Sequence, residues 1–183
     1  MIGSRSNFGR LNAVPNNAES LIFVSTSHLF TFGYEGLDFD AFLIRLREAQ
    51  IRIIVDVREL PLSRKKGFSK TALRDQLAVA GIVYCHVPAL GCPRPIRNQY
   101  RADGDWARYT KDFLAYLETQ DVAVRELAQR SRANAACLLC FEADYSRCHR
   151  TYVARAAKHL GAPPVKHLTA KTTSLDQPLR ASA

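Results

Sequence analysis

The fourteen residues from Cys137 to Arg150, CLLCFEADYSRCHR, contain three of the chain's five cysteines together with a histidine, two carboxylates and two arginines. Such side chains can bind zinc, supply a nucleophilic thiolate or form a redox disulfide. In a strand, however, residues three apart face opposite sides with Cα atoms about 10 Å apart, beyond the roughly 7 Å that a disulfide spans. We therefore expect Cys137 to be a buried core residue, and we reject a redox pair with Cys140.

The second half of this stretch suggests a different chemistry. Cys140 and Glu142 are two residues apart and so share a face near the end of an expected strand. Cys148 falls in the first turn of the following helix, where the helix dipole and Arg147 and Arg150 favour a thiolate. These positions predict a catalytic carboxyl at Glu142 and a nucleophile at Cys148, with Cys140 beside the substrate.

His149 shares the apolar stripe of that helix, whereas Cys148 lies off it; the stripe consists of Val153, Ala156, Ala157 and Leu160. An inward histidine at the start of a helix is either a hydrogen-bonded core residue or a functional acid or base, and both interpretations stay open. Zinc bound by Cys140, Cys148, His149 and His86 is chemically feasible. Because the spacing of these residues is irregular, we predict no metal site.

Asp56 and Arg58 end the apolar run IRIIVDVR and lie on one face of the expected strand. They either orient a ligand and activate water, or they form a structural salt bridge. We include both in the candidate site, Asp56 as a catalytic residue and Arg58 as an anion clamp beside Arg150.

Apolar runs alternate with amphipathic segments along the chain, which predicts a parallel sheet covered by helices on both faces. We expect strands at 29–33, 51–58, 82–90, 135–142 and 165–170, and helices at 38–50, 70–80, 105–132 and 146–160. The pattern indicates a three-layer, Rossmann-like α/β domain with a mostly parallel sheet of about five strands. The domain is expected to span residues 29–170, between an N-terminal extension (1–28) and a C-terminal tail (171–183).

In parallel sheets, ligands bind beyond the carboxyl ends of the strands. The candidate polar residues follow strand ends in this way: Tyr34 and Glu35 after the first strand, Asp56 and Arg58 after the second, His86 after the third, and Glu142 with Cys148, His149 and Arg150 after the fourth. The topology therefore predicts one pocket at this edge.

The formal net charge is +9. The cations concentrate in two segments, 58–74 and 94–101, and such basic patches attract phosphates of small ligands or of nucleic acid. No apolar run is long enough for a membrane span. The odd number of cysteines is typical of a cytoplasmic protein with reduced thiols.

The motifs TFGYEG, IIVDVRELPLSRKKGFSK, GIVYCHVPALG and LLCFEADYSRCHR, in this order, resemble the bacterial family catalogued as domain of unknown function 488. The resemblance runs from about Thr31 to Leu168 and implies the α/β fold. It implies a set of characteristic polar positions, Asp56, Arg58, Ser63, His86, Cys140, Glu142, Cys148, His149 and Arg150, and no particular reaction. Cys92 stands where members often have a second glycine after the L-G pair.

Three possible functions follow from these observations. The first is an enzyme, a hydrolase or transferase, that acts on a phosphate-bearing substrate with His149 or Glu142 as acid or base. The second is a non-catalytic nucleic-acid-binding protein that uses the basic loops. The third is a metal-dependent protein. The sequence identifies no cofactor for any of the three.

Overall fold

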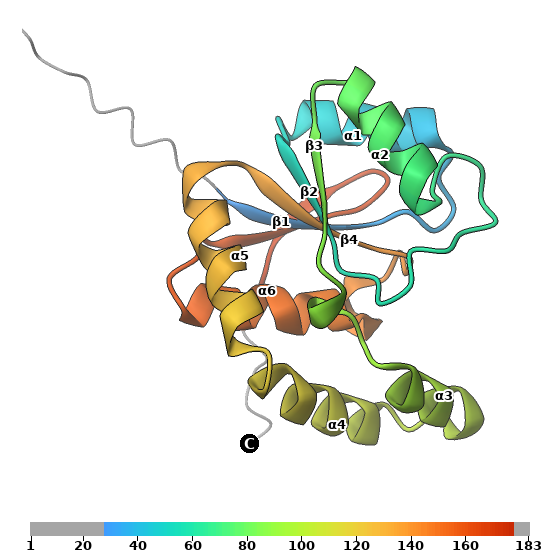
Figure 1. Cartoon of the computed structure of the whole chain (residues 1–183), viewed down its shortest axis with the longest axis vertical. Helices are drawn as coiled ribbons and strands as arrows, with labels where there is room; N and C mark the ends of the chain where they lie inside the picture. The colour runs from blue at the N-terminus through green and yellow to red at the C-terminus, as the bar shows by residue number, and fades with distance from the viewer. Residues whose placement is uncertain (1–27, 178–183) are drawn as a thin grey trace, which may run out of the picture.

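The computed structural model describes residues 28–177 and centres on a six-stranded sheet in the order β3-β2-β4-β1-β5-β6 (Figure 1). The strands are β1 (Leu29–Gly33), β2 (Ile53–Asp56), β3 (Val83–His86), β4 (Ala136–Cys140), β5 (Val165–Leu168) and β6 (Thr173–Leu175). The first five are parallel, and β6 pairs antiparallel with β5. The predicted three-layer, Rossmann-like α/β architecture is thus confirmed, with a short sixth strand added at one edge.

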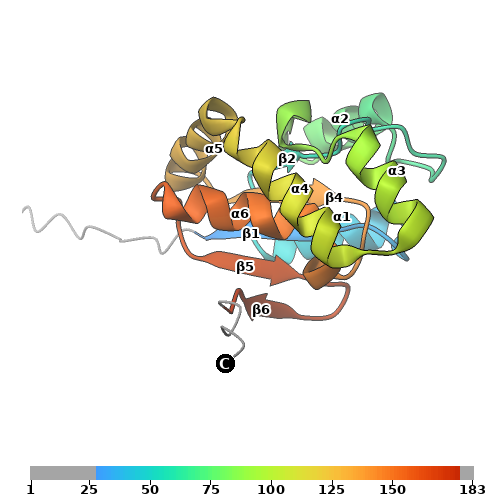
Figure 2. The same cartoon turned by 90° about the horizontal axis from the view of Figure 1, so that it is seen from below.

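Helices cover both faces of the sheet (Figures 1 and 2). They are α1 (Phe39–Glu48), α2 (Lys70–Val79), α3 (Arg94–Asp103), α4 (Trp106–Glu118), α5 (Asp121–Ala133) and α6 (His149–His159), with 3-10 turns at Pro88–Leu90 and Tyr145–Arg147. Ile54 of β2 packs in a core with residues of α1 and α2, whereas the next residue, Val55, packs with α4, α5 and α6. This alternation explains why successive residues of β2, Ile53, Ile54 and Val55, are all apolar.

Local sequence signals account for several helix starts. Asp38 caps α1 by accepting a hydrogen bond from the backbone N of Ala41 at 2.8 Å, and Asp105 caps α4 through the N of Arg108. Ser69 occupies the N-cap position of α2, but its side chain makes no capping hydrogen bond. Cys137 is fully buried in the α1–α2 core, and all five cysteines are free thiols. The expected core role of Cys137 is therefore confirmed.

Three expectations differ from the structure. The predicted helix 105–132 is two helices, because the chain turns at Thr119 and Gln120 between α4 and α5. The segment between the expected strand 82–90 and the expected helix 105–132, for which no helix was predicted, contains α3. This helix starts after Pro93 and is followed by Gly104, a residue in the left-handed conformation with φ of 68°. Proline fits the first turn of a helix, where its missing N–H is not needed.

The third difference is β6, which lies in the segment expected to be a tail. Three mostly exposed residues are too short a run for a detectable period. The expected N-terminal extension lies almost entirely outside the described residues. None of the described helices has the length and apolar character needed to cross a membrane.

The strand register places the carboxyl ends of four strands side by side. Gly33 of β1 pairs with Cys140 of β4, and Asp56 of β2 pairs with Leu139 on one side and His86 on the other. The segments that follow these strands therefore meet at one edge of the sheet, as the sequence predicted.

Candidate functional site

Four side chains converge at this edge and form what we term the thiol cluster: Cys140, Glu142, Cys148 and His149. Their donor atoms all lie within 4.8 Å of one another. Glu142 Oε2 accepts hydrogen bonds from Cys140 Sγ at 2.8 Å and from Cys148 Sγ at 3.2 Å. His149 Nδ1 lies 3.9 Å from each sulfur. The end of β4, the loop that follows it and the start of α6 thus bring these four ionisable side chains together.

The orientation of His149 is determined by its second ring nitrogen. Nε2 lies 2.9 Å from the carbonyl oxygen of Val57, to which it donates a hydrogen bond. The imidazole is 6% exposed and meets the edge of the Phe113 ring at 5.3 Å between centroids. Because Nε2 carries the proton in this contact, the lone pair of a neutral His149 is on Nδ1 and faces the two sulfurs.

Cys148 is buried, with 1% exposure, although the helical wheel predicted that it would lie off the buried stripe. The reason is its backbone: Cys148 is the N-cap of α6, with φ of −137° and ψ of 136°, so the helical period does not apply to it. The thiol consequently turns toward Cys140 and Glu142 rather than toward solvent.

Arg150 is fully buried and does not clamp an external anion. Its guanidinium donates to the carbonyl oxygen of Glu142 at 2.5 Å and to that of Ala143 at 3.2 Å, while Nε has no partner among the described residues. Arg150 therefore acts as a positioning residue that holds the loop between β4 and α6.

The local environment shifts the pKa values of the two cluster thiols in different directions. Burial opposes ionisation of Cys148, but the hydrogen bond with Cys140 and the positive charges of Arg150 and His149 hold the pKa of Cys148 well below its ordinary value. The same hydrogen bond, together with burial and the charges of Cys148 and Glu142, raises the pKa of Cys140. The pKa values of the two thiols are therefore displaced in opposite directions.

Burial also raises the pKa of Glu142, and the charge of Cys148 adds to this shift. Burial by itself would lower the pKa of His149, but the interactions with Cys148 outweigh it and raise that pKa. The thiol cluster is thus an anionic site stabilised by a nearby imidazole and by Arg150.

A cavity of about 530 Å³, here called the edge cavity, opens beside the thiol cluster. Cys140, Glu142 and His149 line it, whereas Cys148 does not. Its aromatic walls and its cations come from several elements: Tyr34, Tyr100, Trp106, Tyr109 and Phe141, with Arg58, Arg64, Lys65, Arg97, Arg101 and Arg147. Glu59 and Glu142 are the acidic residues of the lining, so positive charge dominates.

Asp56 and Arg58 form a buried ion pair. Asp56 accepts from Arg58 Nε at 2.8 Å and Nη2 at 2.5 Å, and also from Tyr84 Oη at 2.7 Å. The remaining Nη1 donates to Tyr34 Oη and to the carbonyl of Phe68. The geometry therefore favours the structural salt bridge over a free clamp. Arg58 lines the edge cavity, whereas Asp56, which is completely buried, does not.

Some of the other predicted site residues line the edge cavity, and others do not. Tyr34 and Ser63 line the edge cavity. His86 hydrogen-bonds through Nε2 to the carbonyl oxygen of Arg58 at 2.9 Å and, like Cys148 and Arg150, is not part of the lining that the described residues form. His86 therefore supports the loop after β2, and it does not join the thiol cluster.

One wall of the edge cavity was not predicted from the sequence. Tyr109 belongs to the buried core and Trp106 packs against it, but both also line the edge cavity, together with Tyr100 of α3. In the structure the Trp106 and Tyr109 rings are stacked 4.7 Å apart, and the Arg147 guanidinium lies over Trp106 at 5.5 Å. The basic character of segment 94–101 was the available signal, and it did not reveal which side chains face the sheet edge.

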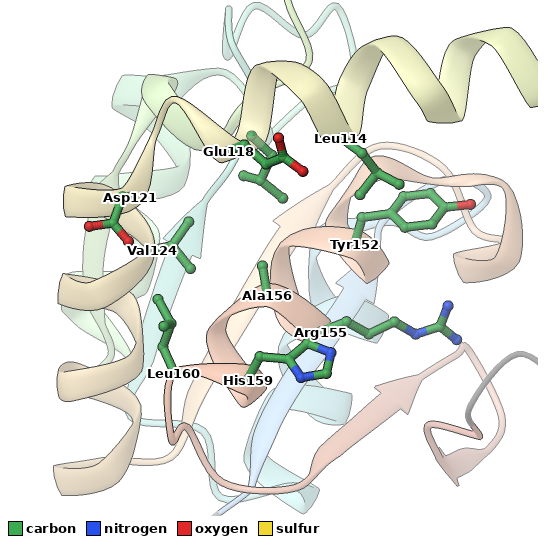
Figure 3. A pocket seen from close by; sticks show the side chains of 10 residues that line it. Leu114, Glu118, Asp121, Val124, Tyr152, Arg155, Ala156, His159 and Leu160 are labelled. Carbon is green, nitrogen blue, oxygen red and sulfur yellow. The ribbon is translucent and has the colours of Figure 1, made fainter.

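A second cavity of about 490 Å³ lies between α4, α5 and α6 (Figure 3). Leu114, Val124, Tyr152, Ala156 and Leu160 give it a mainly apolar lining. It shares no lining residue with the edge cavity, and none of the predicted site residues lies in it.

A family model described as domain of unknown function DUF488 matches residues 38–157, more than half of the chain. The chain belongs to the DUF488 family. The range matched by the DUF488 model contains the whole thiol cluster, whereas β1 and β5 lie outside it. Searches of curated proteins and of solved structures found no match.

Proposed function

We propose that this DUF488 protein is an enzyme that acts on a phosphate-bearing substrate, a nucleotide or a nucleic-acid strand, bound in the edge cavity. The observation that carries the proposal is the position of a cation-rich, aromatic-walled cavity directly beside the thiol cluster. The cations of the lining can bind a phosphate. The side chains of the thiol cluster, next to them, can exchange protons or bind the reacting atoms.

The charge balance of the lining supports phosphate as the bound group. Six lining residues are cationic and two are acidic. Arg58 and Arg97 are already paired with Asp56 and Glu59. Arg64 and Arg101 are exposed and make no ion pair with any described residue, so they are available to a ligand. Arginine suits phosphate because its planar fork can donate two parallel hydrogen bonds.

The aromatic wall supports a nucleotide rather than a simple phosphate. Phe141 lines the cavity and is 44% exposed, so its ring can stack a base, an interaction that contributes about 1–3 kcal/mol per base. The cavity volume of about 530 Å³ is within the usual range for small-molecule sites.

Glu142 is the cluster residue best placed to act on a substrate, because its carboxylate lines the cavity and is partly exposed. His149 has one nitrogen bound to Val57 and the other directed at the sulfurs, so its role in the proposal is to support the thiols. This arrangement suits a hydrolase or a transferase in a reducing cytoplasm, where the five thiols stay free.

Binding can be measured directly, because Trp106 is the single tryptophan of the chain. Nucleoside mono- and diphosphates, pyrophosphate and a short single-stranded oligonucleotide are titrated into the full chain while Trp106 fluorescence is recorded. We expect a saturable change that the double substitution Arg64→Ala and Arg101→Ala weakens by about tenfold or more. Arg130→Ala, an exposed arginine on α5 outside the lining, is the matched control and should leave affinity unchanged.

Turnover is then followed by chromatography of the same compounds. Glu142→Gln should lower the rate by about 10²-fold or more while binding persists, and Glu126→Gln, an exposed control on α5, should not. No fluorescence change with any phosphate compound overturns the proposal. Salt-dependent oligonucleotide binding without turnover of any compound would instead establish the non-catalytic nucleic-acid-binding alternative.

A further inference from the structure

We propose that the thiol cluster is a zinc-binding site, in which Cys140 Sγ, Cys148 Sγ and His149 Nδ1 are buried ligands and Glu142 Oε2 is the fourth ligand, facing the edge cavity. The inference deepens the proposed function by naming a metal for the same site. Its link to a substrate rests on that function, whereas the metal site itself rests on the geometry of the four side chains.

The distances between the donor atoms differ from those of a tetrahedral centre by about 0.5 Å or less. Zinc bonds of about 2.0–2.3 Å place neighbouring tetrahedral ligands roughly 3.3–3.8 Å apart. Here Glu142 Oε2 lies 2.8 and 3.2 Å from the two sulfurs, and His149 Nδ1 lies 3.9 Å from each of them. An ion at the centre needs only small side-chain rotations, because all four atoms already lie within 4.8 Å of one another.

The chemical types of the four donor atoms indicate which metal the site prefers. Two sulfurs and an imidazole nitrogen favour zinc among the abundant biological cations, while magnesium and calcium prefer sites made of oxygen alone. A tetrahedral set with two sulfur ligands is typical of zinc.

The surroundings of the cluster are those of a supported metal site. A histidine ligand usually donates its other ring N–H to a carbonyl or carboxylate, which fixes the tautomer that binds the metal. His149 does so with Val57 O at 2.9 Å. Arg150 fixes the backbone on both sides of the Glu142–Ala143 peptide and places a positive charge beside the anionic ligands.

Burial distinguishes the ligands from one another. Cys140, Cys148 and His149 are at most 6% exposed, whereas Glu142 is partly exposed and lines the cavity. Zinc sites that act in catalysis keep three protein ligands and one exchangeable position. The carboxylate of Glu142 is in that position, so a substrate phosphate or a water molecule can replace it at the metal.

The first test is elemental analysis of the full chain after purification without chelators, with an expected zinc content of about one per chain. Chelator-treated protein is then loaded with Co²⁺, whose thiolate charge-transfer absorption reports sulfur ligation. We expect this absorption in the wild type, and a loss of Co²⁺ and Zn²⁺ affinity of about 100-fold or more in Cys140→Ser, Cys148→Ser and His149→Ala. Cys85→Ser, a partly buried cysteine outside the cluster, is the matched control and should bind as the wild type does.

A measurement on the wild type keeps the test decisive if a cluster variant fails to fold. Zn²⁺ should protect two of the five thiols from a thiol reagent in the native protein, and a chelator should remove that protection. Zinc below about one tenth per chain together with no thiolate–Co²⁺ absorption overturns the inference. So does full metal binding by Cys140→Ser and Cys148→Ser.

The metal and the substrate proposals fail in different ways. Phosphate-dependent Trp106 fluorescence without bound zinc refutes the metal site and leaves the proposed function standing. Bound zinc without any response of Trp106 to phosphate compounds refutes the proposed substrate and leaves the metal site standing.

Discussion

Gly33 lies so close to Glu142 that a Cβ atom at residue 33 would overlap the Glu142 carbonyl oxygen. The segments that follow β1 and β4 remain hydrogen-bonded to each other beyond the sheet. The N of Tyr34 donates to Cys140 O at 3.3 Å, and the N of Glu35 donates to Phe141 O at 2.9 Å. The end of β1 therefore holds the segment that carries Cys140 and Glu142, and it can do so only with glycine at residue 33.

Gly33→Ala should displace the Glu142 backbone and destabilise the protein by about 1–3 kcal/mol, the usual cost of overpacking. Metal binding by the thiol cluster should weaken as well. Gly36→Ala is the control, because Gly36 has open space around its Cα and only its φ of 78° is unfavourable, at about 1 kcal/mol. Urea denaturation followed by Trp106 fluorescence measures the stability of both. Equal stability and equal metal affinity in the two variants would contradict the role given to Gly33.

Arg150→Lys should lower the free energy of unfolding by about 1–3 kcal/mol, because one ammonium group cannot bond both carbonyls that the guanidinium reaches. Arg132→Lys is a close control: the Arg132 guanidinium also donates to two backbone carbonyls, those of Leu160 and Gly161, but it is exposed to water. Water can replace the lost bonds there, so the control should change by less than about 1 kcal/mol. Denaturation curves that shift equally for both variants would show that burial of Arg150 is unimportant.

Asp56→Asn should cost about 3–5 kcal/mol, because it leaves the buried Arg58 without its counter-charge. The comparison is Asp75→Asn, which breaks an ion pair with Arg74 in which both side chains are 59% exposed, and which should cost less than about 1 kcal/mol. Thermal or urea unfolding of the two variants checks this difference. If Asp56 instead served only catalysis, Asp56→Asn would retain full stability and lose turnover.

Asp176 gives the protein a stability that depends on pH. Burial opposes its ionisation, but hydrogen bonds from Arg155 and His167 outweigh burial and lower the pKa of Asp176. A lowered pKa stabilises the fold above the unfolded value of about 3.9, and this contribution is lost as the pH falls through the folded value. Asp176→Asn should therefore cost about 1–3 kcal/mol at pH 7.

The cost of Asp176→Asn should decrease steadily once the pH is below about 4. Urea unfolding at several pH values measures this trend, with Asp112→Asn, an exposed residue of α4, as the control. A cost that is the same at pH 7 and in acid would show that the charge of Asp176 makes no contribution.

The sequence by itself determined the architecture and the edge at which the candidate residues meet. Strand and helix periods are local properties, so they could be recognised without knowledge of the fold. The same local geometry assigned Cys137 to the core and put Cys140 and Glu142 on one face, where the structure shows Glu142 Oε2 accepting from Cys140 Sγ. The α/β topology then brought the ends of the strands together.

Only the tertiary structure decided which of these residues share a cluster. Cys148 is turned inward by its N-cap conformation, and His149 is oriented by Val57, which is 92 positions away in the chain. Asp56 is enclosed by Arg58 and Tyr84, and Trp106 reaches the cavity from the start of α4. Such contacts depend on how separate elements pack and on which side-chain rotamers that packing allows, and neither leaves a periodic trace in the sequence.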